Sequence, residues 1–166
     1  MNSVSWFACC ISLLFITLED LRKREIHVAW FILLGIAELS LLVQSSGFGI
    51  KENLGINALF LISLIGGTYV IFKLRRKGQF FDHYFGWGDV LMMICLSLAL
   101  EPYSLIVFVV GSSWCILLAL IGLHTLTFID IQAVSIPLAG IWALGLLVLI
   151  VLYRLSMLPF EIGLLW

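Results

Sequence analysis

Long apolar segments separated by short polar connections constrain the fold of this chain more than any other feature. A helix that crosses the hydrocarbon core of a bilayer needs roughly 20 mostly apolar residues. The chain is 63% hydrophobic and only 11% charged, which leaves too few polar side chains to coat a water-soluble globule. The sequence therefore predicts an all-α, polytopic integral membrane protein with about six transmembrane helices. We place these helices at Val4 to Leu18, His27 to Gln44, Asn53 to Leu74, Asp89 to Leu100, Tyr103 to Leu123 and Val134 to Tyr153.

The length of the chain leaves little room beyond these helices. We expect residues 1–166 to form a single transmembrane domain with no separate soluble domain. The first segment lacks a positively charged start and a small-residue cleavage site, which favours a membrane helix over a removable signal peptide. The net charge of -1 argues against nucleic acid as a partner. The four cysteines lie in apolar runs without CxxC spacing, which argues against zinc sites and disulfides.

Basic residues indicate the topology. They cluster in the first and third connections, whereas the second contains Lys51 alone. Because Lys and Arg are concentrated in cytoplasmic loops, the first and third connections are predicted to be cytoplasmic and both termini external. Arg154, near the predicted outer end of the last segment, argues mildly against this orientation. The clustered bases are Arg22, Lys23 and Arg24, then Lys73, Arg75, Arg76 and Lys77.

The fourth segment is too short to cross a membrane alone. The residues from Asp89 to Leu100 would span about 18 Å as a helix, against about 30 Å of hydrocarbon. One overlong kinked helix or two short helices would fit the stretch from Asp89 to Leu123. Because proline ends helices, we favour two helices joined at Glu101 and Pro102.

Two aspartates are distinctive because the predicted topology brings them to one membrane face. Asp20 lies at the end of the first segment, and Asp89 begins the fourth, directly after "GWG". Two neighbouring carboxylates that face one water can divide acid and base roles in hydrolysis, since like charges resist double ionisation. Glycine adopts positive φ readily and permits close approach of another backbone. Taken singly, each aspartate fits a structural role, as a helix cap or a solvated loop residue, better than a catalytic one.

Two motifs together carry a resemblance to a known family. The stretch "DLRKREI", Asp20 to Ile26, combined with "GWGDVLMM", Gly86 to Met93, resembles the type IV prepilin leader peptidases and preflagellin peptidases. These are membrane aspartyl proteases of the GxGD class. "VSIPLAGIWALG", residues 134–145, is similar to the final helix of many members. The resemblance implies a catalytic dyad of Asp20 and Asp89, with the active-site loops supported by Gly86, Gly88, Arg24 and Ile26.

The same resemblance implies a function. It predicts an endopeptidase in the cytoplasmic membrane that removes the short basic leader from a type IV pilin-like precursor at the cytoplasmic face. Water would be the nucleophile, no metal or organic cofactor would be needed, and the precursor and membrane lipids would be the partners. His27 and Val28 stand where the family usually has Pro-Asn, and Leu91 stands where it has lysine. These departures leave open a catalytically inactive homologue that acts as a membrane scaffold or assembly partner of a pilus or secretion system.

Other ionisable residues are weaker candidates. Asp130 shares the predicted face and could replace or assist Asp20, whereas Asp82 and His83 fit a solvated loop pair better than a metal site. Glu38 lies within the second segment, where an ionisable side chain suggests function by default. We expect it instead to reach the membrane surface from near the outer end. A proton-coupled transporter using Glu38 would call for paired repeats, and the sequence has none.

Residues beside the first connection have two interpretations. Glu19, Glu25 and Asp82 could attract the basic leader of a substrate. His27 could be a pH-sensitive neighbour of Asp20, but we interpret it, like Trp30, as an interfacial residue.

Overall fold

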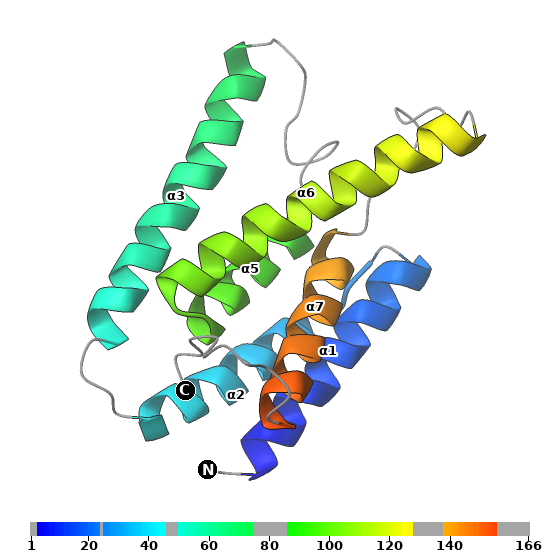
Figure 1. The fold of residues 1–166 in the computed structure, drawn as a ribbon. Coiled ribbons are helices and arrows are strands. Elements are labelled where there is room, and N and C mark those ends of the chain that lie inside the picture. Colours follow the sequence, from blue (N-terminus) through cyan, green and yellow to red (C-terminus); the bar gives the residue numbers. More distant parts are fainter. Residues whose placement is uncertain (1–2, 24, 46–49, 75–85, 128–137, 156–166) are drawn as a thin grey trace.

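The computed structural model describes residues 3–23, 25–45, 50–74, 86–127 and 138–155, which form six helices (Figure 1). Within α1, α3 and α6, the stretches Val4–Lys23, Ile50–Ile71 and Pro102–Ala119 are long and apolar enough to cross a membrane, and the other helices are shorter and apolar. The predicted all-α, polytopic membrane protein is confirmed. The helices are α1 (Ser3–Lys23), α2 (Val28–Ser45), α3 (Ile50–Leu74), α5 (Trp87–Ala99), α6 (Pro102–Thr127) and α7 (Leu138–Arg154).

Two helix boundaries matter for the site. The prediction ended the first helix at Leu18, but α1 continues to Lys23, so Asp20 lies inside a helix. Arg22 and Lys23 occupy the last turn of α1, where positive charge is favourable against the helix dipole. The predicted break at Glu101 and Pro102 is confirmed, because α5 ends at Ala99 and α6 begins at Pro102.

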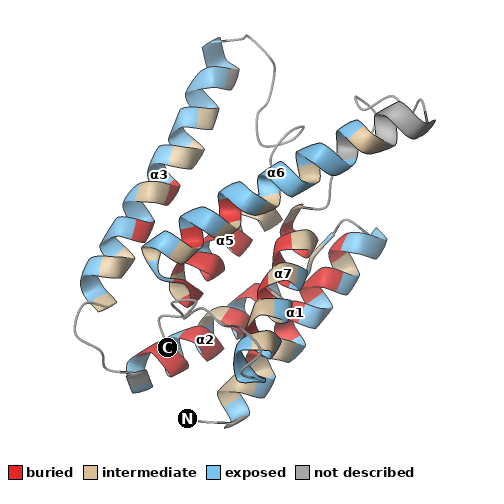
Figure 2. Cartoon of the chain, in the orientation of Figure 1, coloured by how far each residue is buried: buried red, intermediate tan, exposed pale blue. Residues whose placement is uncertain are grey.

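The core lies between α1, α2, α5 and α7. α1 packs against α2 and α7, and both of these helices contact α5. Figure 2 shows buried residues along the facing sides of these helices, whereas α3 and α6 are mostly exposed. The exposed side chains of α3 and α6 are largely apolar, as a lipid-facing surface requires. The core includes Leu13, Ile16, Leu34, Met92, Leu96, Leu146 and Ile150.

Two polar side chains are buried in this apolar bundle. Asn57 of α3 is fully buried, and its Nδ2 donates to the carbonyl oxygens of Ser97 and Leu100, each at 2.8 Å. These bonds tie α3 to the end of α5, where helical carbonyls lack intrahelical partners. Glu38 of α2 is only 1% exposed, and neither carboxyl oxygen has a hydrogen-bond partner among the described residues. The prediction that Glu38 reaches the membrane surface is therefore wrong, because its face of α2 packs into the core.

Candidate active site

The first turn of α7 binds both distinctive aspartates. The backbone N–H of Gly140 donates to Oδ2 of Asp20 at 2.6 Å, and that of Ala139 donates to Oδ1 of Asp89 at 2.9 Å. The first N–H groups of a helix have no intrahelical acceptor, and the helix dipole favours negative charge there. Figure 1 shows the start of α7 beside the end of α1. Two carboxylates 69 positions apart in sequence are thus held by consecutive peptide groups.

Asp20 approaches α7 closely because position 140 is glycine. A Cβ built on Gly140 would lie 2.9 Å from both Cβ and Oδ2 of Asp20, closer than nonbonded atoms normally come. One turn earlier in α1, the Thr17 hydroxyl donates to the Leu13 carbonyl at 2.8 Å and lies 3.4 Å from the Gly140 carbonyl oxygen. Asp20 itself is 7% exposed. The α1–α7 contact therefore buries the carboxylate while supplying it with a donor.

Asp89 is the third residue of α5 and has a donor for each carboxylate oxygen. Besides the Ala139 bond, Oδ2 accepts the Gly86 N–H at 3.2 Å. Gly86 precedes the helix with φ -71° and ψ 149°, an extended conformation open to any residue. The expected use of positive φ at this glycine is therefore absent. Asp89 does not occupy the cap position as predicted, because Gly86 is the cap residue of α5, but from the third helical position its carboxylate accepts the cap N–H.

Gly88 serves close packing. A Cβ at this position would lie 3.3 Å from Cδ1 of Ile26 and 3.9 Å from Cβ of Ala139. Ile26 comes from the connection between α1 and α2, and Ala139 from α7. The missing side chain thus lets both elements approach the turn of α5 that carries Asp89.

The structure brings together most of the residues singled out from sequence. Asp20, Ile26, Gly86, Gly88 and Asp89 gather around the start of α7. Arg24, Asp82, His83 and Asp130 lie outside the described residues. Sequence reasoning missed Ala139 and Gly140, which act through their backbone. The available signal was the pair of small residues two and three positions after Pro137, because proline often marks a helix start.

This arrangement suits acid–base chemistry. Two carboxylates close together resist double ionisation, so a pair of this kind tends to hold one proton. The proton makes one group an acid while the other remains a base. Among the described residues, no group of three or more His, Cys, Asp or Glu side chains could hold a metal ion.

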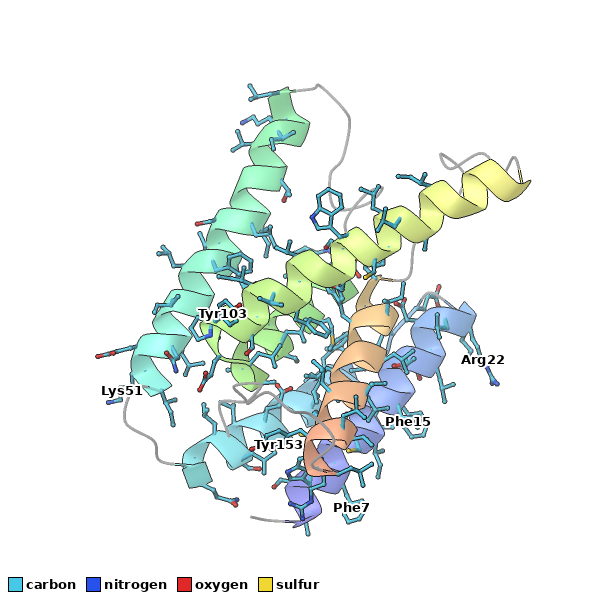
Figure 3. All side chains as sticks on the ribbon, viewed as in Figure 1. Phe7, Phe15, Arg22, Lys51, Tyr103 and Tyr153 are labelled. Atoms are coloured by element: carbon cyan, nitrogen blue, oxygen red, sulfur yellow. The ribbon has the colours of Figure 1, made fainter. Side chains whose placement is uncertain are left out.

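Figure 3 shows Arg22 pointing outward from the end of α1 that carries Asp20.

Comparisons with curated proteins and with solved structures gave no match. A family model matches residues 7–123, a region that contains both aspartates but not α7. On this match the chain belongs to the type IV leader peptidase family, peptidase A24.

Proposed function

We propose that this chain is a membrane-embedded aspartyl endopeptidase that removes the short basic leader from type IV pilin-like precursors, with Asp20 and Asp89 as its catalytic dyad. The observation that supports this best is the binding of both carboxylates to consecutive N–H groups of α7. Structural caps alone would not require two aspartates from different helices at one helix start. Family membership supports the prepilin class of substrate.

The proposed reaction uses the two carboxyl groups in opposite protonation states. The ionised group removes a proton from a water, whose oxygen attacks the carbonyl carbon of the scissile peptide bond. The protonated group donates a hydrogen bond to the carbonyl oxygen as negative charge develops there. When the C–N bond breaks, a proton passes to the leaving nitrogen, and the products are a new carboxylate and a new amine. The N–H groups of Ala139 and Gly140 hold the two carboxylates in place throughout.

Cleavage is proposed at the cytoplasmic face. Asp20 lies on α1 just before Arg22 and Lys23, two exposed basic residues of the kind that stay on the cytoplasmic side. The departures from the usual family residues do not interrupt the contacts to Asp20 and Asp89. Val28 is 56% exposed at the start of α2, and Leu91 packs against the apolar core.

Replacement of each aspartate by asparagine tests the dyad. Asp20→Asn and Asp89→Asn keep the side-chain size and one carbonyl acceptor but cannot share a proton. We expect each variant, co-expressed with a pilin-like precursor, to lose cleavage by about 10²- to 10⁴-fold. Glu52→Gln, an exposed position in the first turn of α3, is the charge-matched control and should cleave normally.

Cleavage that survives either asparagine substitution contradicts the proposed dyad. If the unmodified chain cleaves no precursor but captures a pilus or secretion component stably, the inactive scaffold replaces the peptidase as the function.

A further inference from the structure

Glu19, the neighbour of Asp20, faces α2 and accepts hydrogen bonds there. Its Oε2 accepts the backbone N–H of His27 at 2.9 Å, and its Oε1 accepts Trp30 Nε1–H at 3.1 Å. His27 Nδ1 lies 3.1 Å from both carboxylate oxygens. The Glu19 side chain is only 20% exposed, against 71% for His27. Adjacent residues of α1 thus direct their carboxylates to different helices, Asp20 to α7 and Glu19 to α2.

An aromatic contact reinforces the Glu19 bonds. The rings of Phe15 and Trp30 are stacked, with centroids 4.3 Å apart and planes 1° from parallel. Phe15 lies one turn before Glu19 on the same face of α1. In the structure both His27 and Trp30 hydrogen-bond to Glu19 at the end of α1, and no contact tests the prediction that they are interfacial residues. The last turns of α1 and the first turn of α2 are therefore fixed to each other.

This connection reaches the active site through Ile26. Ile26 directly precedes His27, and its Cδ1 lies beside Gly88, the neighbour of Asp89, because a Cβ added at position 88 would be 3.3 Å from it. Holding the His27 N–H on Glu19 therefore limits the movement of Ile26 over the α5 turn. The family resemblance noted above places proline where this chain has His27, and proline has no N–H to donate. The Glu19 contact thus depends on a residue in which this chain departs from the usual pattern.

We propose that Glu19 is a positioning residue: by accepting the His27 N–H it holds the segment of residues 25–27 against the end of α1, and it thereby keeps Ile26 beside Gly88 and the proposed dyad. This inference rests on the proposed peptidase function. Glu19 touches no reacting atom in this scheme. Its contribution is to the alignment of the α1 and α5 ends, and misalignment of about 1 Å can cost about 100-fold in rate.

Glu19→Gln tests the inference against Glu52→Gln, which removes the same charge far from the segment. We expect Glu19→Gln to lower kcat for precursor cleavage by about 10- to 100-fold with little change in KM. Trp30→Phe removes one donor but retains an aromatic ring to stack on Phe15. As a single substitution, Trp30→Phe should lower kcat. When it is combined with Glu19→Gln it should have little further effect, because the two residues share one interaction.

Hydrogen exchange gives a readout that does not depend on activity. The backbone amide of His27 should exchange faster in Glu19→Gln than in the unmodified chain or in Glu52→Gln. Unchanged exchange at His27 overturns the inference, whether or not the chain cleaves a precursor. Normal kcat in Glu19→Gln also overturns it if Asp20→Asn and Asp89→Asn abolish cleavage, and in that case the proposed function stands. If the unmodified chain is inactive, the peptidase proposal fails and the exchange result alone decides whether Glu19 holds the segment.

Discussion

Gly140→Ala should separate the dyad from α7 by a predictable amount. The added methyl group would lie 2.9 Å from Cβ of Asp20, a backbone-proximal atom that cannot swing away as a side-chain tip can. Nonbonded carbons rest about 3.5–4.0 Å apart, so α1 and α7 would have to move apart by about 0.6–1.1 Å. The same movement lengthens the 2.6 Å bond from the Gly140 N–H to Asp20.

This displacement is large on the scale of catalysis. Misplacement by about 1 Å can cost about 100-fold, so we expect Gly140→Ala to lower kcat by about 10- to 100-fold. Overpacking costs about 1–3 kcal/mol, and alanine gains up to about 1 kcal/mol over glycine in a helix. With the full helix gain, the net loss in the free energy of unfolding should be about 0–2 kcal/mol. Precursor cleavage by purified protein in detergent and denaturant unfolding of the same samples measure the two effects.

Two further glycine substitutions distinguish a loss of cleavage caused by displacing Asp20 from a general loss of stability caused by overpacking. A Cβ at Gly111 has no atom within 4 Å, so Gly111→Ala should cleave normally and gain about 0.5–1 kcal/mol in stability. Gly145 lies on α7, as Gly140 does, but away from the aspartates. A Cβ at Gly145 would lie 2.9 Å from Cζ of Phe108 on α6. Gly145→Ala should therefore lose stability and keep cleavage within about threefold. Normal cleavage by Gly140→Ala, or an equal loss in Gly145→Ala, would refute the reasoning.

Two predictions concern the buried polar residues of the bundle. Glu38→Met replaces a carboxyl group without described partners by an apolar side chain of similar length, and should raise the free energy of unfolding by about 1–3 kcal/mol; an unchanged or lower unfolding midpoint contradicts this. Asn57→Leu removes both bonds to the Ser97 and Leu100 carbonyls and should lower stability by about 1–3 kcal/mol. The check is denaturant unfolding together with hydrogen exchange at the end of α5, and equal stability would show that those bonds contribute nothing.

The sequence was sufficient to predict the helical fold and much of the site. Apolar segments long enough for a bilayer predict helices directly, and Pro102 marks a break because its ring cannot continue the preceding helix. Successive membrane helices alternate in direction, and this alternation together with the basic residues predicted that Asp20 and Asp89 share a membrane face. In the structure both bind the start of α7. Hydropathy misplaced the end of α1 because a polar last turn can remain helical beyond the apolar stretch.

Other features depend on packing that one sequence does not specify. Ala139 and Gly140 contribute backbone N–H groups, which every residue except proline possesses, so their residue types do not identify them as donors, and only their small size indicates a close approach. Glu38 was misjudged because its depth along α2 was estimated without knowing which face meets α1 and α5. The sequence suggests Glu19 only as a charge that could attract the basic leader of a substrate, whereas its carboxylate accepts the His27 N–H just before α2 and the Trp30 N–H in the first turn of α2.

Because consecutive peptide groups of α7 hold Asp20 and Asp89, the two carboxylates are mechanically coupled. A small slide or rotation of α7 would loosen both at once, whereas motion of α1 or α5 alone would release only one. Any movement of α7 would therefore act on both carboxylates of the proposed dyad together, and the region matched by the family, which ends at residue 123, does not contain α7.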